Sequence, residues 1–79
     1  MDKISYKEFM IEAAPYQLPQ SGEWAMRVNI WRDRGSHKNG KPFYAMNTFK
    51  TKEEAIPHCL AIGRQIIDGT IKYWNIDDL

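Results

Sequence analysis

The stretch Thr51-Lys52-Glu53-Glu54 decides the fold, because it separates an aromatic segment from an apolar, periodic one. A Thr followed three residues later by a Glu is the pattern of a capping box. The Thr51 hydroxyl can accept a hydrogen bond from the Glu54 amide, and the Glu54 carboxylate can accept one from the Thr51 amide. The stretch therefore predicts that a strand ends and a helix begins here.

The segment after Thr51 has the three- and four-residue spacing of an amphipathic helix. Asp68-Gly69 ends it well, because glycine adopts the left-handed conformation that satisfies the last carbonyls. Pro57 removes the hydrogen bond to the Glu53 carbonyl, so we expect a kink or an irregular first turn. The apolar positions form one stripe that should lie on a sheet: Ala55, Ile56, Cys59, Leu60, Ile62, Ile66 and Ile67.

Two segments before the capping box predict a pair of antiparallel strands. From residue 24 the pattern alternates, so Met26, Val28 and Ile30 share one face of the strand. Residues 42–49 alternate in the same way. A polar connection, residues 33–41, contains the Asn-Gly pair that favours a turn and joins the two strands as a hairpin.

Residues 6–14 form a shorter apolar segment that stops at Pro15, and we expect a first strand there. Residues 15–22 contain two prolines and a glycine, which predict a connecting loop. The carboxyl end, residues 71–79, is either a short strand or a docked tail. The expected fold is α+β: residues 1–79 form a single domain in which one helix packs on one face of a three-stranded antiparallel sheet, with a short C-terminal tail.

Several classes of function find no support in the residues. Cys59 is the only cysteine, which excludes an internal disulfide and favours a reducing cytoplasm. No signal peptide or membrane-spanning segment is expected. His37, His58 and Cys59 do not have zinc-site spacing, so we expect no metal and no cofactor. We expect Cys59 to be a core residue and His58 to be solvated. No catalytic signature is present, and we expect no enzyme and no catalytic residue.

The charge is unevenly distributed. Residues 27–52 contain seven basic residues against one acidic residue, whereas acidic residues outnumber basic ones in both flanking segments. Cations interleaved with aromatic side chains suit DNA or RNA, although a charged hairpin can also be a solvated edge that prevents aggregation. The candidate nucleic-acid-binding residues are Arg27, Asn29, Trp31, Arg32, Arg34, Lys38, Lys41 and Tyr44.

A sheet with one helix also has an uncovered second face, which suits a protein partner or self-association. Trp31, Tyr44 and Met46 could form a hot spot there. The alternative is that the first loop or the carboxyl tail buries these three side chains. Both interpretations stay open at the level of sequence.

The order of the elements, with Phe49-Lys50-Thr51-Lys52-Glu53-Glu54-Ala55 at the junction, resembles the DNA-binding domain of phage-type tyrosine recombinases. That resemblance implies a sheet in the major groove, with Arg27, Asn29 and Trp31 as readers. Nearly the whole chain also resembles small stand-alone bacterial proteins of uncharacterised function. The segments that carry this second likeness are Pro15-Tyr16-Gln17-Leu18, Ile30-Trp31-Arg32-Asp33-Arg34-Gly35 and residues 59–69.

Replacing the capping residue tests the helix boundary. We predict that Thr51→Ala lowers the free energy of unfolding by about 1 kcal/mol, because the helix loses its N-terminal cap. Thermal denaturation should show a melting temperature roughly 4–8 °C lower. An unchanged melting temperature would place the start of the helix elsewhere.

Overall fold

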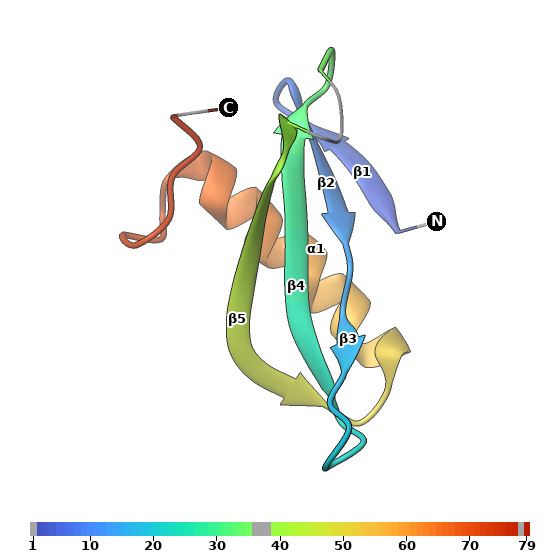
Figure 1. The fold of residues 1–79 in the computed structure, drawn as a ribbon. Coiled ribbons are helices and arrows are strands. Elements are labelled where there is room, and N and C mark those ends of the chain that lie inside the picture. Colours follow the sequence, from blue (N-terminus) through green and yellow to red (C-terminus); the bar gives the residue numbers. More distant parts are fainter. Residues whose placement is uncertain (1, 36–38, 78) are drawn as a thin grey trace.

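The computed structural model describes residues 2–35, 39–77 and 79. Within these ranges the chain forms one helix and five strands (Figure 1). The elements are β1 (Lys3–Tyr6), β2 (Phe9–Ala13), β3 (Tyr16–Gln17), β4 (Trp24–Arg32), β5 (Lys41–Phe49) and α1 (Lys52–Asp68). The α+β class, with one helix and an antiparallel sheet, is confirmed. The expected number of three strands was wrong.

The sheet is built around β4. Strands β2 and β3 pair with β4 along one side, β5 pairs with it along the other, and β1 pairs with β2. All four pairings are antiparallel. In Figure 1 the sheet lies in front of α1, so the viewer sees the face of the sheet that the helix does not cover.

The segment predicted as one strand, residues 6–14, belongs instead to a hairpin of β1 and β2. Lys7 and Glu8 form its turn with φ values of 46° and 71°, a left-handed conformation that residues with a side chain rarely adopt. Because neither residue is Gly or Asn, the sequence contains no signature for this turn. Asp68 at the end of α1 holds the turn: its Oδ1 lies 2.6 Å from Lys7 Nζ, and its Oδ2 accepts a hydrogen bond from Tyr6 Oη at 2.9 Å.

These contacts change the acidity of both charged groups. The hydrogen bond from Lys7, and then that from Tyr6, hold the pKa of the Asp68 carboxyl below its usual range. The same hydrogen bond raises the pKa of the Lys7 ammonium. Both groups are therefore charged at neutral pH, and the ion pair joins the β1–β2 turn to the far end of α1.

The expected loop over residues 15–22 also contains regular structure. Tyr16 and Gln17 form β3 and pair with Ala25 and Trp24. The turn that follows is closed by a hydrogen bond from the Leu18 amide to the Glu23 carbonyl at 2.8 Å. Prolines on both sides limit β3 to two residues, which is why the local pattern indicated only a loop.

Helix α1 has the predicted ends. Thr51 is the N-cap, and its hydroxyl accepts from the Glu54 amide at 3.2 Å. The reciprocal contact differs from the expected one, because the Thr51 hydroxyl lies 3.3 Å from the Glu54 carboxylate and donates to it. Gly69 ends the helix with φ 77°. The α-helix continues through Pro57, so the expected irregular first turn is not observed.

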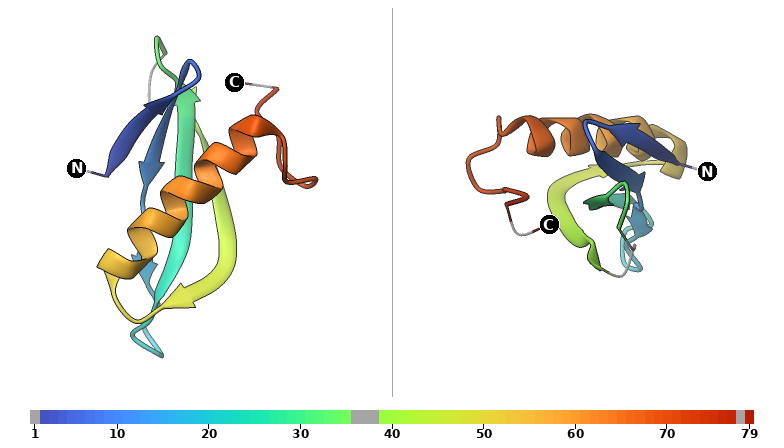
Figure 2. Two further views of the ribbon diagram at one scale, coloured as in Figure 1. Left: turned by 180° about the vertical axis from the view of Figure 1, so that it is seen from behind. Right: turned by 90° about the horizontal axis from the view of Figure 1, so that it is seen from above.

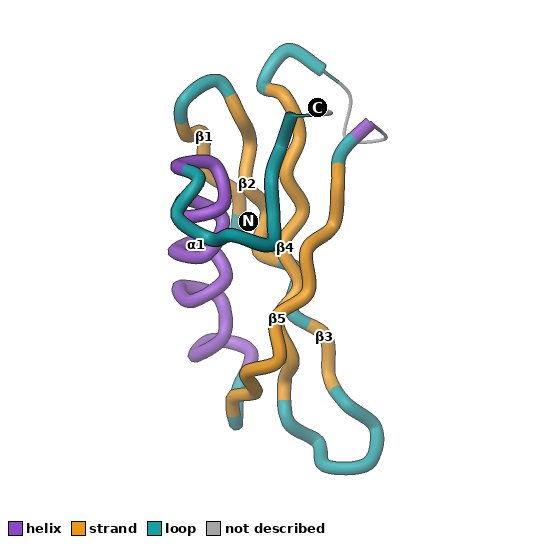
Figure 3. The backbone as a smooth tube through the Cα atoms, turned by 90° about the vertical axis from the view of Figure 1, so that its left-hand side faces the viewer, coloured by secondary structure: helices purple, strands orange, loops and turns teal. Residues whose placement is uncertain are grey.

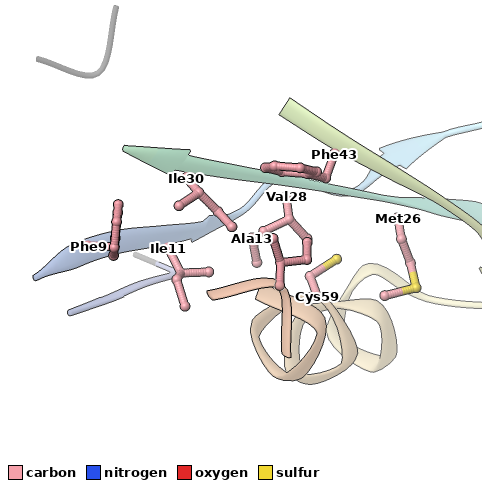
Figure 4. Close-up of a cluster of buried hydrophobic side chains, with 9 residues drawn as sticks. Phe9, Ile11, Ala13, Met26, Val28, Ile30, Phe43 and Cys59 are labelled. Atoms are coloured by element: carbon pink, nitrogen blue, oxygen red, sulfur yellow. The ribbon is translucent and has the colours of Figure 1, made fainter. Parts of the chain in front are cut away.

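Strand β4 presents the predicted face to the helix. Met26, Val28 and Ile30 are at most 1% exposed and belong to the hydrophobic core (Figure 4). Helix α1 approaches this layer at Gly63, where a Cβ atom would lie 3.3 Å from Val28 Cγ1 and would overlap the Ile11 side chain. The core position predicted for Cys59 is confirmed, since it is fully buried.

The described residues of the carboxyl end, 70–77 and 79, form a docked tail rather than a strand. The tail leaves α1 and turns back beside β5, on the side of the sheet that carries the helix (Figures 2 and 3). The Trp74 ring meets Phe43 edge-on, with ring centroids 5.7 Å apart. Ile71, Ile76 and Leu79 also pack against the core. The tail therefore covers core residues near β5, beyond the edge of α1.

Strand β5 is bent by two extra residues. Ala45 lies opposite Met26, but Thr48 lies opposite Ala25, so Met46 and Asn47 have no partner on β4. A bulge of this kind bends the strand and increases its twist, and Figure 1 shows the strong curvature of β5. The Met46 side chain is 95% exposed as a result.

No helix within the described ranges is long and apolar enough to cross a membrane.

The conformation of Glu8 gives a test of the unexpected hairpin. We predict that Glu8→Gly stabilises the protein by about 1 kcal/mol, because glycine adopts φ 71° without a Cβ clash. The melting temperature should rise by roughly 4–8 °C. Lys3→Gly, in an ordinary part of β1, is the control and should destabilise. A loss of stability in both variants would contradict the turn.

Candidate nucleic-acid interface

The side of the sheet opposite α1 is called the open face here, and it carries Tyr16, Arg27, Asn29, Trp31 and Tyr44. Alternation along β4 points Arg27, Asn29 and Trp31 away from the Met26–Val28–Ile30 layer. Tyr44 lies directly opposite Arg27 on β5, and Tyr16 contacts both. The structure therefore brings two predicted residues, Arg27 and Tyr44, together with a tyrosine that the sequence did not indicate.

Arg27 is the centre of this group. Its guanidinium lies over the Tyr16 ring, 5.4 Å from the centroid, and its Nε donates to the Ala14 carbonyl at 3.0 Å. The Tyr16 and Tyr44 rings meet edge-on with centroids 6.3 Å apart. The hydrogen bond uses only one of the five N–H groups of the guanidinium. Arg27 is thus fixed in position and keeps donors on Nη for an outside acceptor.

Asn29 is engaged within the protein. Its Nδ2 donates to Glu12 Oε1 at 3.1 Å, and both side chains are half-buried. The two residues are also directly opposite each other in the ladder of β2 and β4. The open face therefore includes a carboxylate beside Asn29, which makes this surface less basic than the sequence block implied.

Of the two interpretations left open for Trp31, exposure and burial, the structure shows burial. Trp31 points away from α1, but its side chain is only 7% exposed. A ring buried to this extent cannot stack on a base or form an exposed hot spot in this conformation. Of the proposed hot spot, only Tyr44 at 54% and Met46 at 95% exposure remain accessible.

Arg32 lies on the other side of the sheet. It is opposite Phe9 in the ladder, its guanidinium lies 4.8 Å from the centroid of that ring, and its Nε donates to the Leu79 carbonyl at 2.8 Å. These contacts attach the tail to the end of β4. The structure thus assigns Arg32 to tail docking rather than to the open face.

The remaining basic candidates are dispersed. Arg34 is exposed at the hairpin end, in a hollow of about 430 Å³ that Glu8, Arg32 and Asp33 also line. A neighbouring hollow of about 410 Å³ is lined by Arg32, Arg34, Gly35, Asn39 and Leu79. Lys41 lies opposite Ile30, with its ammonium 5.6 Å from the centroid of the Phe43 ring, and so belongs to the helix side. Lys38 lies outside the described residues.

Tyr16 is the residue that the sequence analysis missed. It follows Pro15 in a segment whose composition indicated a loop, and its pairing with Ala25 depends on β4. Strand β3, which follows β2 after Pro15, forms because it pairs with the distant strand β4 and not because of its local sequence. An aromatic residue between two prolines was the only local signal.

Other reactive groups do not form a site in the described part of the chain. Burial raises the pKa of the Cys59 thiol, which disfavours the nucleophilic thiolate. His58 is exposed, as predicted, and stacks on Phe49 with ring centroids 4.6 Å apart. No three His, Cys, Asp or Glu side chains among the described residues gather closely enough to hold a metal ion.

Comparison with known proteins gives no relative: no family model, no curated protein and no solved structure matches the chain. The resemblances to recombinase DNA-binding domains and to stand-alone bacterial proteins therefore stay predictions.

The position of Arg32 generates a test. We predict that Arg32→Ala speeds amide hydrogen exchange of residues 70–79 several-fold, because the tail loses a hydrogen bond and a cation–π contact worth together about 1 kcal/mol. Arg34→Ala removes the same charge from the same hairpin end and is the matched control. Equal exchange of the tail in the two variants would contradict the docking role.

Proposed function

We propose that this protein is a non-enzymatic, cytoplasmic domain that binds nucleic acid through the open face. Arg27 would contact a phosphate, Tyr44 would contact a base, and Arg34 at the hairpin end would add a second phosphate contact. Arg32 and Trp31, which were candidates on sequence grounds, have no direct role in this proposal.

The observation that carries the proposal is the group formed by Tyr16, Arg27 and Tyr44. An arginine anchored through Nε and over an aromatic ring is well suited to hold a phosphate, because little side-chain entropy remains to be lost. An exposed aromatic ring directly across the ladder adds a surface for a base. Cation and ring lie together on the face that α1 leaves uncovered.

A second function is favoured by a separate observation. Tyr44 and Met46 are both exposed on β5, and exposed aromatic and methionine side chains are common in protein interfaces. The competing proposal is therefore self-association, or binding of a protein, through this part of β5. Such contacts are mainly apolar and should depend little on salt.

Salt dependence tests the proposed function. Neutralising two phosphates of a single strand gives a slope of about −1.4 in a plot of log K against log salt, so a fourfold increase in salt should weaken binding about sevenfold. The measurement is an amide-shift titration with a short duplex and a single strand at low and moderate salt. We expect shifts at Tyr16, Arg27, Asn29 and Tyr44 that diminish with salt.

The absence of any shift at low salt, with either form of DNA, would contradict nucleic-acid binding. A change in apparent mass with protein concentration that is insensitive to salt would favour self-association instead. Light scattering over a dilution series measures that alternative directly.

A further inference from the structure

We propose that the ligand of the open face is single-stranded nucleic acid, with one unpaired base stacked on the Tyr44 ring and a neighbouring phosphate on Arg27. The inference rests on the proposed function and names the class of nucleic acid that this surface selects. It follows from how firmly the protein holds each side chain of the open face.

Tyr44 offers a ring that a base can reach. Its side chain is 54% exposed although it lies within a strand, and the edge-on contact with Tyr16 constrains its orientation. A ring that lies on a sheet and is supported by a neighbour can pair with the flat surface of a base at little entropic cost. Stacking of this kind tolerates any base, since every base has a π-face.

Arg27 fixes where the phosphate would lie. The Ala14 carbonyl accepts from Nε and the Tyr16 ring lies against the guanidinium, which leaves the Nη groups as donors. Arg27 and Tyr44 are directly opposite each other in the ladder, a relation that places Cβ atoms about 5 Å apart. One nucleotide can therefore touch the ring with its base while an adjacent phosphate reaches the guanidinium.

The same contacts disfavour a duplex. Bases inside a duplex are stacked on one another, and a ring held at the surface of a sheet cannot reach their faces. Reading a groove requires side chains that extend to the base edges. Arg27 is held by Ala14 and Tyr16, Asn29 donates to Glu12, and Trp31 is 7% exposed. Of the three readers expected for a sheet in the major groove, Asn29 and Trp31 are thus engaged within the protein, and Arg27 is held close to the sheet through its Nε.

The distribution of charge on the open face also favours a single strand over a duplex. A duplex carries one phosphate charge about every 1.7 Å along its axis, and a surface that attracts it usually has a dense array of cations. The open face has the Glu12 carboxylate next to Asn29. Arg32 and Lys41, which could have made the array dense, lie on the helix side. This arrangement suits one or two phosphates of a flexible strand better than the rigid double row of a duplex.

The experiment compares a short single DNA strand with the same strand annealed to its complement, by fluorescence anisotropy at one low salt concentration. We expect the single strand to bind more tightly. Tyr44→Leu should weaken single-strand binding at least about fivefold, whereas Tyr44→Phe, which keeps the ring, should bind within about twofold of the unaltered protein. Both variants change an exposed side chain, and their melting temperatures verify the fold.

Tyr73→Leu is the matched control, because Tyr73 is 88% exposed but lies in the tail. It should bind both probes like the unaltered protein. Equal or tighter binding of the duplex, or an equal loss in Tyr44→Leu and Tyr73→Leu, would overturn the single-strand inference while the proposed function stands. Binding of neither probe would overturn the proposed function and this inference with it.

Discussion

The close contact between α1 and the sheet at Gly63 determines which side of the sheet is left to a ligand. Only a residue without a side chain lets the helix backbone come this near to Ile11 and Val28. The contact fixes α1 on the face formed by Met26, Val28 and Ile30 and buries the Cys59 side chain between the helix and the sheet (Figure 4). Because side chains alternate along β4, Arg27 lies on the opposite face, where it is directly across from Tyr44 of β5.

The basic segment is continuous in sequence but divided in space. Arg27 and Arg32 are five positions apart on one strand, and an odd spacing places them on opposite faces of the sheet. The ladder confirms the division, since Arg27 lies opposite Tyr44 whereas Arg32 lies opposite the core residue Phe9. The count of charges along the chain therefore overstated the basic surface. The alternation of side chains along β4 would have been enough to separate Arg27 from Arg32.

Sequence patterns predicted the elements whose determinants are local. Thr51 and Gly69 marked the ends of α1, and alternation in β4 identified its buried face. The β1–β2 hairpin was missed because Lys7 and Glu8 form a left-handed turn that their residue types do not favour, with support from the distant Asp68. Strand β3 was missed because its pairing depends on β4.

The residues of the candidate site also divide into those that local patterns predict and those that depend on distant contacts. Arg27 and Tyr44 were predictable, since both follow from the alternation of two adjacent strands. Tyr16 was not, because a segment between two prolines indicates a loop. The roles of Arg32 and Trp31 depend on contacts that no local pattern specifies, such as the hydrogen bond of Arg32 to Leu79, 47 residues further along the chain.

The arrangement of helix and sheet is tested most directly by nuclear Overhauser effects from the α-protons of Gly63. These protons should show contacts with the methyl groups of Ile11 and Val28 and none with the side chains of Arg27 or Tyr44. Contacts from Gly63 to Tyr44 or Arg27 would place the helix on the other face. In that case the open face, and every binding proposal built on it, would be contradicted.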